Sequence, residues 1–327
     1  MKSYNTVALA KKILSLSQIG SWRKAMAEKG KRIAVVLGSF DILQPGNLAA
    51  IREAKKQAEN VCVLIEHNKI QWHAPHRHNP VEIRMKVVSH LEDVSAISFV
   101  SKTTEQLKEL QPYTIIDCLA QPACTSVRKK LRDMAEIIVN IQPLSGCFTA
   151  DIKKSIRSLQ VPIRIPPQAR EPLPNNVELQ KTIQECRREK QPLVTVNGCF
   201  DILHIGHVCF LAQARSMGGK LIVLVNDNAS VRAYKGASHP VFPIEFRIQA
   251  LRALDSVSLA YPFSGDNPLK LLAKIRPDIH VKGGTYNSDR VHMEEKLLKK
   301  WGGEVKFCPM VKGYSTEQLI SNMQNTT

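Results

Sequence analysis

Two stretches of this chain read alike, and this internal repeat constrains the fold more than any other feature of the sequence. Residues 33–68 run IAVVLGSFDILQPGNLAAIREAKKQAENVCVLIEHN, and residues 193–228 run LVTVNGCFDILHIGHVCFLAQARSMGGKLIVLVNDN. Each contains an apolar run, a Gly-x-Phe-Asp turn, a segment with apolar residues at helical spacing and a second apolar run. This order predicts a strand–helix–strand unit, and consecutive units of this kind predict a parallel sheet.

The likeness continues beyond these segments. PVEIR at 80–84 corresponds to PIEFR at 243–247, and GCFT at 146–149 corresponds to GYST at 313–316. A basic, amphipathic segment precedes each copy, at 17–30 and 177–190. We therefore expect an α/β protein with two tandem, doubly wound parallel-sheet (Rossmann-like) domains, in which Gly46 and Gly206 occupy equivalent helix starts.

A proline-rich stretch separates the copies. Five prolines fall between residues 161 and 176, at positions 162, 166, 167, 172 and 174. Proline at this density disfavours helix and sheet, which predicts a semi-rigid linker. We expect one domain at 1–160, the linker at 161–176 and a second domain at 177–327, because a chain of 327 residues can form two cores.

Composition narrows the functional classes. The net charge of +17 is compatible with a nucleic-acid binder, with a site for phosphorylated ligands or merely with a soluble surface. It is spread along the chain rather than gathered in one tract, which argues against nucleic acid. No apolar run approaches the ~18 residues that a membrane span needs. Lys11 and Lys12 interrupt the apolar stretch at the N-terminus, so we do not expect a secretory signal there. Eight cysteines without a CxxC pair or metal-ligand spacing suit a reducing cytoplasm. We expect a cytoplasmic protein with no membrane contact and no protein-held metal.

The two copies differ at their ionisable residues. Gln44 and Asn47 stand where the second copy has His204 and His207. The remaining differences are Cys118 in place of Lys282, Phe148 in place of Ser315, and no clear counterpart of Lys235. A copy that keeps its strands and turns but loses these groups is predicted to be a pseudo-enzyme, and catalysis is predicted in the second copy.

The run GCFDILHIGH at 198–207 carries the chemistry of that copy. A helix that starts near Gly206, after a glycine turn at the carboxyl edge of a parallel sheet, offers backbone N–H groups to an anion. His204 and His207 lie three residues apart, so both can face that anion, and Gly206 allows the backbone to approach a phosphate closely. An ordinary capped helix start is the alternative interpretation.

Such a site suits attack on the α-phosphorus of a nucleoside triphosphate. A phosphate-ester nucleophile is already anionic, so the protein has to position the reactants and stabilise charge. Two imidazoles, a lysine and a divalent cation, which we expect to be Mg²⁺, would do this.

Three further segments are candidates for the same site. Lys235, in a polar loop after the second strand, would lie over the phosphates or is a solvated loop residue. Arg247 would reach the anion or pair with Glu245. The GYST run at 313–316 would form a second phosphate cradle, with an ordinary N-cap as the alternative.

Together with VKGGTY at 281–286 and GGEV at 302–305, these motifs resemble the cytidylyltransferase-like family over residues 185–325. Within it they are most similar to the adenylyltransferase domain of bacterial ADP-heptose synthesis, which joins AMP from ATP to a heptose 1-phosphate for lipopolysaccharide. The resemblance implies catalytic roles for His204, His207 and Lys235. It implies nucleotide-binding roles for Gly198, Cys199, Phe200, Asp201, Gly206, Arg247, Gly313, Tyr314, Ser315 and Thr316, and substrate-binding roles for Asp227, Lys282, Gly283 and Thr285.

The resemblance leaves the substrates open. Thr285 stands where the family has Asp, and Asp227-Asn228 stands where it has Ser-Asp, so the sugar is in question. Tandem copies are typical of the ethanolamine-phosphate cytidylyltransferases, which makes CTP with an alcohol phosphate (phosphoethanolamine or glycerol 3-phosphate) the alternative. HIGH at 204–207 also spells the signature of class I aminoacyl-tRNA synthetases, but the chain shows no lysine-rich KMSKS-type loop.

Assembly is a further expectation from the resemblance. Related single-domain enzymes are thought to pair with their sites facing each other. The two copies here would then form such a pseudo-dimer within one chain.

Overall fold

Two compact units make up the chain in a computed structural model, one comprising residues 1–149 and the other residues 150–325. The structure describes residues 11–67, 78–100, 103–117, 134–140, 149–158, 161–167, 170–284, 288–309, 311 and 313–325. No helix within these ranges is both long and apolar enough to cross a lipid bilayer.

Unit 1 is built on a five-stranded parallel sheet with the order β3-β2-β1-β4-β5. Its strands are β1 (Ile33–Gly38), β2 (Asn60–Glu66), β3 (Ala96–Val100), β4 (Thr114–Asp117) and β5 (Ile137–Asn140). Its helices are α2 (Leu16–Glu28), α3 (Pro45–Gln57), α4 (Val81–Ser89) and α5 (Thr103–Leu110).

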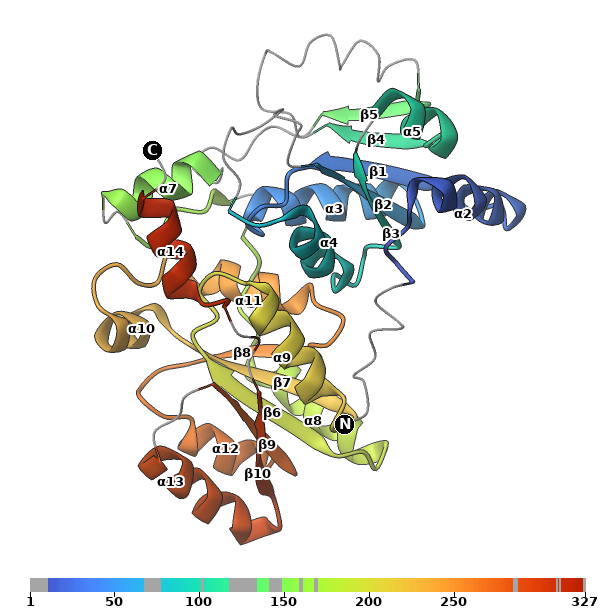
Figure 1. Ribbon diagram of the computed structural model, residues 1–327. Coiled ribbons are helices and arrows are strands. Elements are labelled where there is room, and N and C mark those ends of the chain that lie inside the picture. Colours follow the sequence, from blue (N-terminus) through green and yellow to red (C-terminus); the bar gives the residue numbers. More distant parts are fainter. Residues whose placement is uncertain are drawn as a thin grey trace. The chain divides into compact units, whose positions relative to one another are not determined.

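Unit 2 repeats this sheet, with the order β10-β9-β6-β7-β8 and every pairing parallel (Figure 1). Its strands are β6 (Leu193–Gly198), β7 (Lys220–Asn226), β8 (Leu259–Phe263), β9 (Ile279–Gly283) and β10 (Glu304–Cys308). Its helices are α7 (Thr149–Arg157), α8 (Asn176–Arg188), α9 (Ile205–Arg215), α10 (Asn228–Lys235), α11 (Ile244–Arg252), α12 (Leu269–Ile275), α13 (Ser288–Leu298) and α14 (Thr316–Asn325), with a 3₁₀ turn at Lys299–Trp301.

The two sheets share one strand order, because β6 to β10 take the places of β1 to β5. Gly46 and Gly206 are each the second residue of the helix after the first strand, α3 and α9. The predicted α/β class, with two tandem doubly wound parallel sheets, is therefore confirmed.

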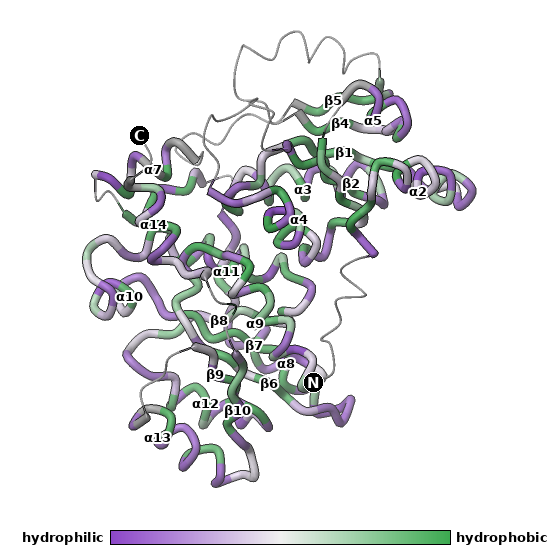
Figure 2. The backbone as a smooth tube through the Cα atoms, viewed as in Figure 1, coloured by the Kyte–Doolittle hydropathy of each residue, from purple (hydrophilic) through white to green (hydrophobic). Residues whose placement is uncertain are grey.

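Helices cover both faces of the second sheet, because its central strands β6 and β7 are apolar and buried along most of their length. In β7, Ile222 and Leu224 pack in one cluster with residues of α8, α12 and α13. The alternate residues Leu221 and Val223 are also fully buried and point to the opposite face, where α9 and α11 contact the strand. Figure 2 shows these strands as mostly hydrophobic tubes and the helices as mixed ones.

Helix α7 and part of the proline-rich stretch belong to unit 2. We expected residues up to 160 in the first domain, whereas residues 150–325 form the second compact unit and so include α7 beyond its first residue. Arg157 Nη2 of α7 donates to Met323 O of α14 at 3.3 Å. The proline-rich stretch is held in the same unit, since Arg232 Nη2 donates to Val161 O at 2.9 Å. Within the described part of 161–175 the backbone forms neither strand nor α-helix.

Candidate active site

Two histidines meet at the N-terminus of α9, just beyond the carboxyl end of β6. His204 is the N-cap residue of this helix, and its Nδ1 accepts a hydrogen bond from the backbone N–H of His207 at 3.4 Å. The two rings stack with their centroids 3.8 Å apart and their planes 24° apart. The sequence expected both imidazoles at one helix start, and the structure brings them together there.

Gly206 is required between these histidines for a steric reason. A Cβ at this position would lie 2.9 Å from both Cε1 and Nδ1 of His204, and 3.4 Å from the carbonyl oxygen of Tyr314. A side chain at 206 would therefore displace the His204 ring. This requirement adds to the close phosphate approach that the sequence suggested.

Burial keeps both imidazoles neutral. It lowers the pKa of His204 to about 4, with Glu317 opposing this shift and Lys235 adding to it. Burial also places the pKa of His207 well below its usual value, helped by His204 and Lys235. A neutral imidazole has one N–H donor, and because Nδ1 of His204 accepts a bond, its proton is on Nε2. His204 therefore presents a neutral Nε2–H donor beside the positive end of a helix dipole.

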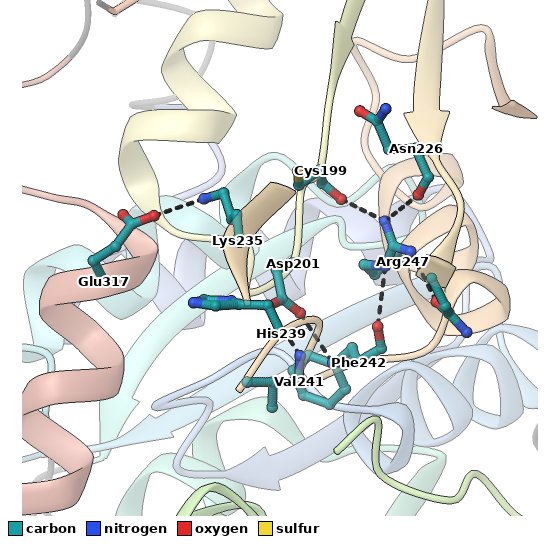
Figure 3. A network of polar contacts seen from close by, with 10 residues as sticks. Cys199, Asp201, Asn226, Lys235, His239, Val241, Phe242, Arg247 and Glu317 are labelled. Atoms are coloured by element: carbon teal, nitrogen blue, oxygen red, sulfur yellow. Dashed lines mark hydrogen bonds and ion pairs between the residues drawn. The ribbon is translucent and has the colours of Figure 1, made fainter. Parts of the chain in front are cut away.

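We expected Lys235 in a polar loop, but it is the last residue of helix α10. The helix forms because Asp227 caps it, with Oδ1 accepting from Ser230 N at 2.7 Å, and it ends at Gly236, whose φ is 91°. Lys235 Nζ forms an ion pair with Glu317 Oε1 at 2.6 Å, shown in Figure 3. Burial alone would lower the pKa of Lys235, but the bond and charge of Glu317 raise it.

The GYST segment ends in a capped helix start, as the alternative interpretation held. Ser315 Oγ accepts a hydrogen bond from Gln318 N at 3.1 Å, and Thr316 is buried as the first residue of α14. This helix start also lies against the start of α9, through Tyr314 and Gly206. Two helix N-termini, the histidine pair and Lys235 thus converge on one region, which favours an anionic ligand.

Arg247 is bonded to the framework of the site, and the anion contact and the Glu245 pairing that the sequence suggested stay predictions. Its side chain is 1% exposed. Four of its N–H groups donate to protein oxygens, namely Phe242 O at 3.0 Å, Cys199 O at 2.7 Å, Asn226 O at 2.8 Å and Asn228 Oδ1 at 2.9 Å. Figure 3 shows it joining the turn after β6 to the end of β7 and the start of α11.

Asp201 completes this framework. Its carboxylate accepts from the backbone N–H groups of Val241 and Phe242, both at 2.9 Å, and lies 3.1 Å from His239 Nδ1. Because the carboxylate is 3% exposed and already bonded, it holds the segment before α11 against the turn that precedes the histidines.

Unit 1 contains the same framework without the histidines. Asp41 accepts from His78 N and Asn79 N at 2.9–3.0 Å, and Arg84 donates to Asn79 O at 3.1 Å and Glu66 O at 2.8 Å. The turn phenylalanines also match, with φ of 49° at Phe40 and 46° at Phe200.

The glycine of each turn makes room for that phenylalanine. A Cβ on Gly198 would lie 3.0 Å from the Phe200 ring, and the same distance separates a Cβ on Gly38 from the Phe40 ring. The Gly-x-Phe-Asp turn is thus a structural element of both units. Contacts of Gly198, Cys199, Phe200 and Asp201 with a nucleotide stay predictions.

The residues predicted on the substrate side divide into two groups. Lys282, near the end of β9, donates from Nζ to Asn197 Oδ1 at 3.0 Å and to Glu294 Oε1 at 2.8 Å, and Gly283 ends the same strand. Asp227 instead caps α10 and accepts from Ser264 Oγ at 2.5 Å. Thr285 lies outside the described residues.

Two acidic residues at this site were not among the sequence candidates. Glu317 directly follows the GYST run, and an acid in the first turn of a predicted helix was the available signal. Glu294 lies in the middle of α13, where no sequence pattern distinguishes it from a solvated acid. The contact of each with a lysine arises only from the fold.

Comparison with known proteins gives a consistent result. The family model described as "Cytidylyltransferase-like" matches residues 35–158 and 195–322. The protein named "Bifunctional protein HldE" is 40% identical in Alkalilimnicola ehrlichii and 43% identical in Methylococcus capsulatus, in each case over 148 residues, or 45% of this chain. The chain covers 31% of each of those proteins, so it spans about a third of their length.

Solved structures with detectable likeness cover parts of the chain. A lipopolysaccharide core biosynthesis protein from Thermoplasma volcanium is 25% identical with a TM-score of 0.33, covering 38% of this chain and 99% of that one. A pantoate-beta-alanine ligase from Francisella tularensis is 15% identical with a TM-score of 0.32, covering 45% of this chain and 75% of that one.

Proposed function

The chain belongs to the cytidylyltransferase-like family, and on this premise we propose that unit 2 is a nucleotidyltransferase that transfers a nucleoside monophosphate to a phosphate ester. The family match confirms the resemblance drawn from the motifs. In the proposed reaction an oxygen of the acceptor phosphate attacks the α-phosphorus of the triphosphate. A new phosphoanhydride bond forms, the bond between the α-phosphorus and the bridging oxygen breaks, and pyrophosphate leaves.

The convergence of the histidine pair with Lys235 at two helix starts is the observation that carries this proposal. His204 offers a neutral Nε2–H donor, which can bind a phosphate oxygen without taking a proton from the reaction. Lys235 carries a full positive charge at neutral pH and lies on the next helix along the chain. Donors of this kind stabilise charge that develops on the α-phosphate and pyrophosphate oxygens.

The acceptor requires no general base, and the framework around the histidines agrees with this. The nucleophile is an anion already, and the buried carboxylate of Asp201, in the turn before the histidines, is bonded to two backbone amides and faces His239. A carboxylate held in this way is not available to take a proton or to bind a cation.

We propose that Mg²⁺ enters as part of the nucleotide substrate. Mg²⁺ prefers oxygen ligands and is commonly bound through substrate phosphates. The described residues contain no group of three or more His, Cys, Asp or Glu that could hold a metal ion. In this proposal the triphosphate oxygens bind the cation, and the histidines and Lys235 bind the phosphates around it.

We propose ATP and a heptose 1-phosphate-type sugar phosphate as the substrates. The motifs shared with the adenylyltransferase domain of ADP-heptose synthesis support this choice, as does 40–43% identity to the proteins named HldE. The tandem of two units with one strand order favours the alternative, CTP with phosphoethanolamine or glycerol 3-phosphate.

One experiment distinguishes these substrates. Purified full-length protein with Mg²⁺ is given each of the four nucleoside triphosphates and each acceptor phosphate in turn, and pyrophosphate release is measured. We expect release with ATP and heptose 1-phosphate. Release with CTP and an alcohol phosphate would support the alternative, and no release with any pair would refute the proposed activity.

Restoring histidines to unit 1 is expected to restore no activity. The pair Gln44→His and Asn47→His would be introduced into a chain whose second unit carries His204→Ala and His207→Ala, and pyrophosphate release measured. The restored pair would still lack equivalents of Lys235 and other site residues, and groups that act as a unit do not rescue piecemeal. Turnover above the inactive background would show instead that unit 1 retains a working site.

The ion pair between Lys235 and Glu317 leads to a prediction of its own. The Glu317 carboxylate forms an ion pair with the Lys235 ammonium, and it therefore competes with the triphosphate that we expect this ammonium to bind. Glu317→Gln should remove this competition and lower the KM for ATP. Because the Glu317 side chain is 61% exposed, solvent screens the pair and we expect a decrease of about twofold to fivefold.

Initial rates at varied ATP concentration measure this effect, and added salt should diminish it. Glu304→Gln is the matched control, since Glu304 is similarly exposed at 59% but pairs with Lys306 on β10. A higher KM in Glu317→Gln than in the unmodified protein would show that Glu317 assists nucleotide binding.

A further inference from the structure

A buried acid fixes the ammonium group of Lys282. Lys282 Nζ donates to Glu294 Oε1 at 2.8 Å and to Asn197 Oδ1 at 3.0 Å. The side chain of Glu294 is 3% exposed, whereas that of Lys282 is 16% exposed. The three residues come from different elements, α13, β9 and β6, so the fold itself brings them together.

A neutral histidine, His280, lies next to the Glu294 carboxylate of this ion pair. His280 is fully buried, its Nδ1 lies 2.8 Å from Thr195 Oγ1, and its Nε2 lies 3.8 Å from Glu294 Oε1. Burial places the pKa of His280 well below its usual value, and the charge of Lys282 adds to this effect. Because the imidazole is neutral, Lys282 supplies the positive charge that balances Glu294 among these groups.

Burying this ion pair carries an unfavourable desolvation free energy, which a purely structural contact would not require. Removing a carboxylate from water costs several kcal/mol, and a pair of apolar side chains would often serve the fold as well. Here the pair lies at the carboxyl ends of the neighbouring strands β6 and β9, the edge where parallel α/β sheets bind ligands. Asn197 directly precedes Gly198, the first residue of the run that carries the histidines.

The geometry also determines what Lys282 can do. A lysine ammonium has three N–H donors, and two of these are directed to Asn197 and Glu294. The third is available for an anion at the partly exposed end of the side chain. An ammonium fixed in this way loses less conformational entropy when it binds a ligand than a free lysine would.

We propose that Glu294 is a positioning residue for the acceptor side of the reaction, holding Lys282 so that its third N–H binds the phosphate of the acceptor. This inference rests on the proposed function of unit 2. Glu294 itself touches no substrate, and its effect passes through Lys282. Its loss should therefore weaken binding of the acceptor phosphate more than binding of the nucleotide.

The test is steady-state kinetics on the full-length protein with ATP, Mg²⁺ and heptose 1-phosphate. Glu294→Gln keeps the shape of the side chain but removes its charge, and we expect the KM for heptose 1-phosphate to rise about tenfold. The KM for ATP should change by less than about twofold, because the histidines and Lys235 bind the nucleotide. Glu295→Gln, on the next residue of α13, is the matched control and should behave like the unmodified protein.

Two further variants keep the test decisive if Glu294→Gln folds poorly. Lys282→Met removes the phosphate contact, and Lys282→Met with Glu294→Met replaces the ion pair by apolar side chains of similar size, which buried sites often tolerate. Since Glu294 acts through Lys282, the double variant should have the same acceptor KM as Lys282→Met alone. Melting temperatures of all variants report folding.

The outcomes separate this inference from the proposed function. If the unmodified protein transfers AMP but Glu294→Gln leaves the acceptor KM unchanged, or raises both KM values equally, Glu294 does not position Lys282. Additive effects in the double variant would refute it as well. If the unmodified protein transfers no nucleotide to any acceptor of the panel, both proposals fail.

Discussion

Replacing either histidine of the pair with alanine is expected to lower kcat by about 10²–10³-fold, which is typical for the loss of one donor that stabilises a transition state. His204 offers its Nε2–H because its Nδ1 already accepts the backbone N–H of His207, and His207 holds the stacked ring in place. Each side chain contributes chiefly when charge develops on the phosphates, so kcat should fall more than the KM for ATP rises. Single-turnover pyrophosphate release measures this effect.

Folding must be separated from chemistry in this test, because His204 is 5% exposed and caps α9. The chain itself supplies fold-preserving replacements, since unit 1 has Gln44 and Asn47 at the equivalent helix start. We therefore expect His204→Gln and His207→Asn to lose turnover like the alanine variants while their melting temperatures change little. His292→Ala, an exposed histidine on α13, is the control. Full activity in His204→Ala would place the catalytic centre elsewhere.

The fold could be predicted from the sequence because its signals are local and occur twice. Each apolar run and each glycine turn specifies its element over a few residues, and the second copy confirms the interpretation of the first. The helix that carries Lys235 was missed although its signal was present. Asp227 followed by Ser230 has the spacing of an N-cap that accepts from the third residue of a helix, which is how the structure uses it.

The burial of Arg247 and Asp201 could not be predicted from local sequence motifs. Arg247 was a candidate because a charged residue near a phosphate motif suggests a ligand contact, and the family resemblance implied such a contact for Asp201. Their burial is a property of the packed unit, which a motif does not contain. Arg84 and Asp41 persist in the copy that lacks the histidines, which indicates that these two residues serve the fold in both units.

The acids of the site could not be found from sequence for a related reason. Lys235 and Glu317 are separated by 82 residues, and their contact depends on how α10 and α14 pack. Glu294 is closer to Lys282 in the chain, 12 residues away, but the pair forms only because α13 packs against β10, which pairs with β9. Side chains that act through a distant partner have no fixed spacing to recognise.

Loss of the buried arginine is expected to have the largest effect on stability. Arg247→Leu removes four hydrogen bonds and leaves buried acceptors, including Cys199 O and Asn226 O, without their donor. Leaving a buried polar acceptor without its donor costs about 1–3 kcal/mol of unfolding free energy per group. Hydrogen exchange resolved by segment, read at the amides of β6 and β7, should show faster exchange throughout unit 2.

The equivalent arginine of unit 1 makes this prediction specific. Arg84→Leu should destabilise unit 1 by a similar amount, seen at the amides of β1 and β2, while turnover in unit 2 persists. Arg252→Leu is the matched control. Arg252 is the last residue of α11, the helix that contains Arg247, but its side chain is 37% exposed and pairs with Glu178 at 3.7 Å. A surface pair of this kind contributes about 0–1 kcal/mol. If Arg247→Leu were as stable as this control but no longer bound ATP, Arg247 would contact the nucleotide after all, and its bonds to the framework would be secondary.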